Sequence, residues 1–357
     1  MPNTPYRPLP NKQQLIERIE KGRRSKWWRR AGSPSRGFSY VDASGKNITD
    51  DATIERIKSL VIPPAWRLVR ISPAASSRVQ AVGVDTTRRI QYLYNPQFAA
   101  RQQRKKYEKI ERFGALLPKL RQVTNEHLVL DGFPRDKVLA LVLRLINQLY
   151  IRMGDEKSVR DYKTFGITTL KNRHLEIKRN GRLVFEFVGK SHIKHRKVLV
   201  DKDLADILAG LRNLGPARKL FHYHNEEGKV RPIKPSDVNG YIKTHTSDEF
   251  SSKDLRTWGA TLLAAVELAE IGPAESEAEM KKNVVRAIKT VAEQLGNTPT
   301  VCRSSYIHPI VLKAYEAGEV IKDFRPRKSR RTARTEAEFD AEEDALLKLL
   351  AAYRKGR

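Results

Sequence analysis

The chain has 357 residues, with 69 lysines and arginines against 41 aspartates and glutamates, which gives a formal net charge of +28. Hydrophobic residues make up 39% of it, so the chain can form real cores, and its length predicts about two domains. The sequence has no membrane-length apolar run and no signal-peptide pattern, and its single cysteine, Cys302, excludes an intramolecular disulfide. We expect a cytoplasmic protein that makes no membrane contact and binds nucleic acid.

The first third of the chain is predicted to be rich in β-strands. Short alternating runs between about residues 37 and 96 indicate antiparallel strands joined by hairpins, with one helix in DDATIERIKSL. In IQYLY, Tyr92 and Tyr94 project from one face and Gln91 and Leu93 from the other, because side chains alternate along a strand. The following segment, RQQRKKYEKIER, has the pattern of a highly basic helix that would connect two lobes.

The rest of the chain is predicted to be mainly helical, from the apolar spacing of KVLALVLRLINQLYIR and NVVRAIKTVAEQL. Residues 165–200 are the exception, because FGITTL, HLEIKR, RLVFEFVG and HRKVLV are strand-like and Asn180-Gly181 is a strong hairpin turn. Beyond Phe324 a basic run precedes an acidic one, where Thr335 fits a capping box that opens a short helix with an apolar side. We expect this tail to be peripheral.

Common nucleotide and metal motifs are missing from the sequence. Gly189-Lys190-Ser191 resembles the end of a phosphate loop, but Val184 stands where that loop needs glycine and a strand follows instead of a helix. We find no HExxH, no GxSxG and no acidic cluster with two-metal spacing. The sequence therefore predicts chemistry without a nucleotide, a metal or another cofactor.

Several polar residues occupy positions that the predicted elements would hold rigid. Arg152 ends an apolar helix that Gly154 could cap, and Lys190 lies in the turn of FVGKSH. The others are Lys253 and Arg256 on one face near a helix start, Asn297 just after a helix, and Tyr306 nine residues later. Taken one by one, each of these residues has an ordinary structural explanation. Arg152 would be a helix-end charge, Lys190 a solubilising lysine at a hairpin tip, Asn297 a helix cap and Tyr306 a half-buried aromatic. Together they could supply the donors, the acid and the nucleophile that cleavage of a phosphodiester needs.

The strings IRMG, TLKNRHLEI followed by FEFVGK, KDLRTWG, and LGNTPTVCRSSYIHP closely resemble, in order and spacing, the catalytic lobe of type IB DNA topoisomerases. The compact poxvirus-like and bacterial subgroup is the most similar, and RRIQYLY resembles the DNA-contacting strand of its N-terminal lobe. The resemblance covers roughly residues 27–324. It implies a monomer that relaxes supercoiled duplex DNA through a transient single-strand break, without ATP or metal, and that associates with the nucleoid.

The resemblance also implies a role for each matching residue. Arg152 and Arg256 would bind the non-bridging oxygens of the scissile phosphate, Lys190 would protonate the 5′-oxygen, and Tyr306 would form a 3′-phosphotyrosyl bond. Asn297 stands where the viral and many cellular enzymes have histidine, and it can donate a hydrogen bond but not as a cation. Lys253 would have an auxiliary positioning or proton-transfer role. The implied DNA contacts are Gln91, Tyr92 and Tyr94, although part of Gln91 could instead fill the β lobe.

Two alternatives remain at this stage. Tyrosine recombinases share the catalytic lobe, but KDLR lacks the histidine that they usually carry three residues before the second arginine, and their N-terminal domain tends to be helical. A non-enzymatic architectural protein would explain the charge of +28, but not Tyr306 together with four donor residues in family order.

The predicted fold class is α+β, with a small N-terminal antiparallel β domain and a larger, mainly α-helical catalytic domain that contains a β-hairpin or small sheet. This is the catalytic fold of the tyrosine recombinases and type IB topoisomerases. The expected segments are an N-terminal extension at 1–26, a β-rich DNA-clamp domain at 27–98, a basic hinge helix at 99–112, a catalytic domain at 113–324 and a basic-then-acidic tail at 325–357.

Overall fold

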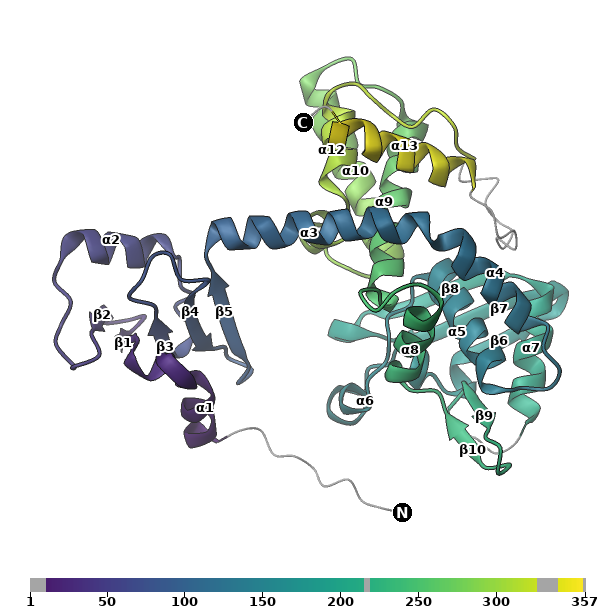
Figure 1. The fold of residues 1–357 in the computed structure, drawn as a ribbon, viewed down its shortest axis with the longest axis horizontal. Helices are drawn as coiled ribbons and strands as arrows, with labels where there is room; N and C mark the ends of the chain where they lie inside the picture. Colours follow the sequence, from purple (N-terminus) through teal and green to yellow (C-terminus); the bar gives the residue numbers. More distant parts are fainter. Residues whose placement is uncertain (1–10, 215–218, 326–339, 356–357) are drawn as a thin grey trace. The chain divides into compact units, whose positions relative to one another are not determined.

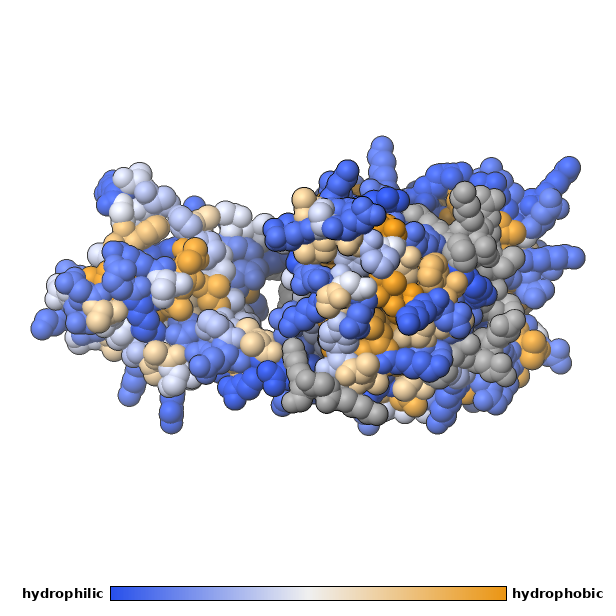
Figure 2. All heavy atoms as spheres, turned by 90° about the horizontal axis from the view of Figure 1, so that it is seen from above, coloured by the Kyte–Doolittle hydropathy of each residue, from blue (hydrophilic) through white to orange (hydrophobic). Residues whose placement is uncertain are grey.

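The computed structural model describes residues 11–214, 219–325 and 340–355. The chain forms two compact units, Met1–Lys106 and Tyr107–Arg357, and each has hydrophobic cores of its own. Hydrophilic side chains dominate the face of the molecule seen in Figure 2, in keeping with the high proportion of charged residues. Within the described ranges, every helix is too short or too polar to cross a bilayer.

The first unit is built on one antiparallel sheet with the strand order β2-β1-β3-β4-β5 (Figure 1). The strands are β1 Trp28–Ser33, β2 Gly37–Val41, β3 Arg67–Ile71, β4 Val79–Val84 and β5 Ile90–Tyr94. The helices of this unit are α1 Lys12–Ile19 and α2 Asp51–Ser59. The predicted antiparallel strands and the helix in DDATIERIKSL are confirmed, whereas α1 and β1 were not predicted.

The two faces of this sheet carry separate small cores. Val82 and Val84 point to one face and pack with Leu15 and Ile19 of α1. Ala81 points to the other face, where it packs with β3 and with Ile57 of α2. The alternation of β4 therefore places apolar side chains on both sides of the sheet, and one helix contributes to each core.

A single continuous helix, α3 Pro96–Ala115, runs through the segment expected to join the lobes. The division between the two compact units falls inside it, after Lys106. Its later residues Tyr107, Ile110 and Phe113 are buried, at a spacing of three that places them on one side of the helix. The basic helix was predicted, but the burial of one side of its later turns was not.

The second unit is mainly helical and is organised around α5 Arg135–Leu149, whose side chains from Val138 to Ile146 are all buried. This burial explains why KVLALVLRLINQLYIR is apolar almost all round. The other helices are α4 Leu117–Leu128, α6 Glu156–Tyr162, α7 Lys202–Asn213, α8 Pro235–His245, α9 Ser252–Ile271, α10 Glu277–Leu295, α11 Pro299–Ser305, α12 Pro309–Glu316 and α13 Ala341–Lys355.

A three-stranded antiparallel sheet, β6-β7-β8, interrupts the helices (Figure 1). Its strands are β6 Leu175–Lys178, β7 Arg182–Val188 and β8 Lys194–Val200, and a second hairpin pairs β9 His222–His224 with β10 Val230–Pro232. Asn180, at φ 61°, makes the predicted turn. The prediction of a strand in FGITTL is wrong: Ile167–Thr169 is a 3₁₀ turn, because the Thr168 and Thr169 hydroxyls bond to the backbones of Gly154 and Gly166.

The expectation of a peripheral tail is wrong for residues 340–355. Helix α13 packs against α9 and α12, and Leu346 and Leu350 are fully buried. Glu343 is also buried and pairs with Arg121 of α4 at 2.5 Å. The capping box predicted at Thr335 lies outside the described residues. The last helix is therefore part of the core of the second unit.

Candidate active site

The last turn of α10 holds three cations that come from distant parts of the chain. The helix ends at Leu295, and Gly296 follows it in the left-handed conformation. Carbonyl groups at a helix end lack intrahelical partners and carry partial negative charge, so they attract cations. The bonds are Lys197 Nζ to the Gln294 carbonyl, Arg256 Nη2 to the Leu295 carbonyl at 3.0 Å, and Arg152 Nη2 to the Gly296 carbonyl at 2.9 Å.

Arg152 reaches this turn from an extended segment and not from a helix end. Helix α5 stops at Leu149, and Tyr150 in the left-handed conformation closes it. The ring of Tyr150 packs against Gly259 of α9, where any Cβ would overlap it. The expectation that Gly154 caps the helix is therefore wrong, since that glycine is required for close contact with Thr169.

Arg256 lies in the first turns of α9, with only 4% of its surface exposed. Burial, and then the neighbouring charge of Arg152, lower the pKa of Arg256 to about 10, an effect that the nearby Tyr306 partly offsets. Its Cζ lies 5.6 Å from the centroid of the Tyr306 ring. A buried guanidinium without a carboxylate partner is unfavourable on its own, so this arrangement suits an anionic ligand.

Tyr306 follows α11 directly and is half-buried. Its backbone is tied to α9, because the Thr261 hydroxyl donates to the Tyr306 carbonyl at 3.2 Å and accepts from the His308 amide at 3.1 Å. Cys302 lies one turn earlier and is fully buried, and burial raises the pKa of its thiol to about 11. The backbone from Tyr306 to His308 is thus held against α9 by the Thr261 side chain.

Three buried donors at this point have no hydrogen bond of normal geometry within the described part of the chain: Nε and Nη1 of Arg256 and Nδ2 of Asn297. Asn297 is oriented by its Oδ1, which accepts a bond from Arg152. Leaving one buried donor unpaired costs about 1–3 kcal/mol, and three converge here. A phosphate oxygen is an acceptor that would satisfy them.

Lys190 is exposed in the turn between β7 and β8. It lines the same small cavity as Arg152, His195 and Lys197. The His195 ring lies between Gly189 and Gly296, where an added Cβ on either glycine would overlap it. The turn that carries Lys190 is therefore held against the end of α10.

Sequence reasoning missed His195 and Lys197 as members of this site. Burial, and then the charges of Lys197, Arg152 and Arg256, lower the pKa of His195 to about 4, so its ring is neutral at pH 7. The signal that could have found them is the period of two in β8, where His195, Lys197 and Leu199 are the less exposed residues. Lys253, by contrast, is exposed one turn before Arg256.

The three residues expected to contact DNA lie on β5 in the first unit. Tyr92 and Tyr94 are exposed on one face and stack at 6.2 Å between centroids. Gln91 does not share that face, and its amide donates to the Asp85 carboxylate at 2.9 Å. Gln91 therefore faces away from the two tyrosines, whose exposed rings remain available to a ligand.

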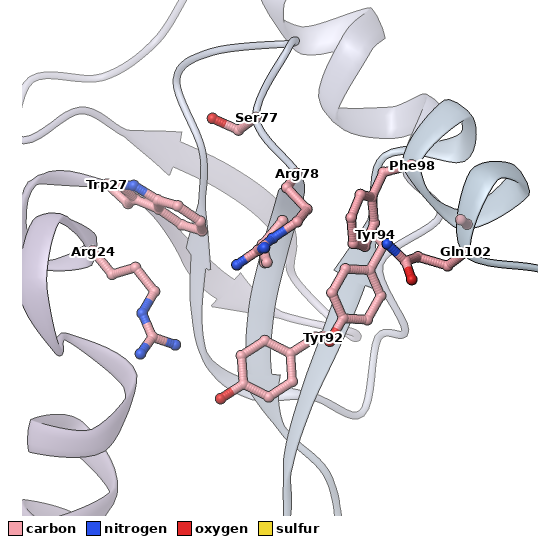
Figure 3. A pocket seen from close by; sticks show the side chains of 10 residues that line it. Arg24, Trp27, Ser77, Arg78, Tyr92, Tyr94, Phe98 and Gln102 are labelled. Atoms are coloured by element: carbon pink, nitrogen blue, oxygen red, sulfur yellow. The ribbon is translucent and has the colours of Figure 1, made fainter. Parts of the chain in front are cut away.

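Cations and aromatic rings surround the two tyrosines in an open hollow of about 770 Å³ (Figure 3). The Arg24 guanidinium lies 5.9 Å from the Tyr92 ring centre, and that of Arg78 lies 5.4 Å from the Phe98 ring centre. Trp27 lines the opposite side of the hollow. Aromatic faces interleaved with arginines are typical of nucleic-acid-binding surfaces.

Comparisons with known proteins agree on one family. The model of the eukaryotic DNA topoisomerase I catalytic core matches residues 95–331, and that of the bacterial DNA topoisomerase IB N-terminal domain matches residues 37–85. DNA topoisomerase 1B of Acanthamoeba polyphaga mimivirus is 30% identical over 325 residues, which cover 89% of this chain and 92% of that protein. DNA topoisomerase 1B of vaccinia virus (strain Copenhagen) is 25% identical over 255 residues, covering 70% and 74%.

A solved structure of the XerH site-specific recombinase bound to its difH substrate aligns with a TM-score of 0.35 and 16% identity, over 54% of this chain and 48% of that one. A likeness of that size carries no argument about function. Both matching family models and both viral relatives are topoisomerases, which decides against the recombinase and the architectural protein that the sequence left open.

Proposed function

This chain belongs to the type IB DNA topoisomerases, and we propose that Tyr306, Arg152, Arg256, Lys190 and Asn297 form the centre with which it cuts and rejoins one DNA strand. As a member of that family it is an isomerase that relaxes DNA supercoils. The observation that carries the proposed centre is the group of buried Arg256 and Asn297 donors beside the Tyr306 ring that have no acceptor in normal hydrogen-bond geometry among the described residues.

In the proposed reaction the Tyr306 oxygen attacks the scissile phosphorus. A bond forms between that oxygen and phosphorus, and the bond from phosphorus to the 5′-oxygen breaks. The phenol proton passes to solvent, while Lys190 gives a proton to the departing 5′-oxygen. Arg152, Arg256 and the Asn297 amide hydrogen-bond the non-bridging oxygens, where charge accumulates in the transition state.

The product is a 3′-phosphotyrosyl ester and a free 5′-hydroxyl. Because one phosphoester replaces another, the energy of the broken bond is kept and the reverse attack rejoins the strand. Rotation of the free end between the two steps removes supercoils, so the cycle needs no nucleotide hydrolysis. Lys253, exposed one turn before Arg256, has an auxiliary role in the same centre.

The hollow around Tyr92 and Tyr94 is proposed as a second contact with duplex DNA. Exposed rings and the guanidinium groups of Arg24 and Arg78 support it. With a net charge of +28, affinity for DNA should fall steeply as salt is added, because each phosphate contact releases counterions. We also propose that the protein acts as a monomer, which light scattering tests, and that it associates with the nucleoid.

Trapping the covalent intermediate tests the centre. Purified protein is mixed with supercoiled plasmid in EDTA without ATP, stopped with denaturant and digested, and the plasmid is examined for nicks linked to peptide. The wild type should relax the plasmid and leave a covalent adduct, whereas Tyr306→Phe should bind DNA with neither result. Tyr353→Phe, on α13, is the matched control and should behave as wild type.

Labelling the two fragments at a mapped nick identifies the linkage. The peptide should remain on the 3′-end of the upstream fragment, and the downstream 5′-end should accept phosphate from a kinase without prior phosphatase treatment. A normal adduct in Tyr306→Phe, or a peptide on the 5′-end, would overturn the assigned nucleophile and its chemistry.

A further inference from the structure

The ammonium group of Lys197 occupies a position in the active site that the reaction above does not use. It lies on β8 facing Arg152 and Arg256, and it donates a hydrogen bond to the Gln294 carbonyl in the last turn of α10. Resting on the proposed function, we propose that Lys197 is a positioning residue that fastens the β7–β8 hairpin to α10 and so holds Lys190 at the scissile phosphate.

This placement is not that of an ordinary surface lysine. Within the described residues Lys197 has no carboxylate partner, and the charges that face it are the cations Arg152 and Arg256. Its burial, and then Arg256 and Arg152, lower the pKa of Lys197 to about 8. The partial negative charge of the α10 end is what opposes this repulsion.

Among the described residues, the β7–β8 hairpin makes few other contacts with α10. His195, two residues earlier on the same face of β8, fills the space between Gly189 and Gly296 with its ring. Lys197 adds a directional hydrogen bond to the Gln294 carbonyl, and this bond fixes the position of the hairpin relative to the end of α10. Lys190 sits in the turn of that hairpin, so its ammonium position depends on both contacts.

The groups that face Lys197 are Arg152, Arg256, His195 and, across the cavity, Lys190. In the DNA-free protein Lys197 loses its proton as the pH rises through about 8, and the bond to Gln294 weakens. A phosphate held by the arginines would favour the protonated form. In the DNA-free protein, the contact between the hairpin and α10 should therefore weaken as the pH rises through about 8. The same contact in Lys197→Arg should not change over that range.

The test separates positioning of Lys190 from general damage by changing the leaving group. At the mapped cleavage site, a duplex is made with sulfur in place of the bridging 5′-oxygen, because a thiolate leaves without needing a proton. Single-turnover adduct formation is measured at saturating protein for Lys197→Met, Lys197→Arg and Lys190→Ala. Arg196→Met, which faces the other side of β8 beside Glu186, is the matched control.

We expect Lys197→Met to cleave the oxygen substrate about 10²-fold more slowly than wild type, the size typical of a misplaced catalytic group. Most of that loss should disappear with the sulfur substrate, as it should for Lys190→Ala. Lys197→Arg, which keeps a cationic donor for the Gln294 carbonyl, should cleave at close to the wild-type rate. Arg196→Met should match wild type on both substrates.

Wild-type rates for Lys197→Met on the oxygen substrate would overturn the proposal, and so would an equal loss on both substrates. Urea unfolding of each variant shows whether it is folded, and Lys197→Leu, which likewise cannot donate to the Gln294 carbonyl, replaces Lys197→Met if that variant is unstable. Failure of the wild type to form any adduct would instead refute the proposed function.

Discussion

Gly296 is the residue whose replacement by alanine best tests how the hairpin is docked. It has φ +62°, where an alanine costs roughly 1–2 kcal/mol. A methyl group there would overlap the His195 ring, which lies close to the backbone of Gly189 on its other side. Overpacking of this kind adds about 1–3 kcal/mol, so Gly296→Ala should destabilise the protein by about 2–5 kcal/mol.

Gly132→Ala is the control, because Gly132 has φ +63° but nothing within 4 Å of its would-be Cβ. It should cost only about 1–2 kcal/mol in urea unfolding. Gly296→Ala should also slow DNA cleavage, whereas Gly132→Ala should not, and adding His195→Ala to Gly296→Ala should recover part of the stability. The reasoning is falsified if the two glycine variants lose the same stability, or if His195→Ala recovers none of it.

Three further predictions concern burial. Glu343→Gln, which removes the buried carboxylate charge that pairs with Arg121, should lower the free energy of unfolding by about 3–5 kcal/mol in urea. Asp344→Asn, which removes the exposed partner of Lys348, should cost under about 1 kcal/mol. Equal losses would contradict the packing of α13 into the core. Cys302, whose pKa burial raises to about 11, should resist a thiol reagent at pH 8 until the protein is unfolded, and rapid labelling of the active native protein would refute this. Burial lowers the pKa of His195 to about 4, below its unfolded value of about 6.5, so the stability that His195 contributes is complete above pH 6.5 and falls as the pH drops toward 4. In urea unfolding, His195→Gln should reduce this loss of stability at acid pH. The same dependence of unfolding free energy on pH in both proteins would count against a buried, neutral His195.

The strands and long helices could be predicted because their patterns are local. Alternation in β4 and β5 and the apolar spacing of α5 and α10 follow from which side of each element is buried. FGITTL failed because its threonine hydroxyls bond to the backbones of Gly154 and Gly166, and the Gly154 side of that contact cannot be seen in a short window. The burial of α13 was missed for a similar reason, since its acidic residue Glu343 is matched by an arginine 222 positions away.

The candidate site was found through resemblance, because each residue alone has an ordinary structural explanation. Arg152 was expected at the end of a helix capped by Gly154, whereas Tyr150 closes the helix before it. Lys197 was not predicted because its position depends on a hydrogen bond to the Gln294 carbonyl. Every residue has a backbone carbonyl, so the sequence does not show which one a lysine will bind. The alternation of side chains along β8 predicts which face Lys197 projects from, but it does not predict that Lys197 binds Gln294.

The end of α10 explains how a helix terminus that repels anions can build a phosphate site. Its free carbonyls cannot bind phosphate themselves, unlike the N–H groups of a helix start. They instead hold Arg152, Arg256 and Lys197, each by one donor. Burial, and then repulsion between these cations, lower the pKa values of Arg256 and Lys197. In the proposed centre, an arriving phosphate would relieve that repulsion and satisfy the donors left over, so the site would be arranged before DNA binds and would need little rearrangement in the transition state. On this proposal these few cations govern cleavage, and the dispersed remainder of the charge of +28 governs affinity and its dependence on salt.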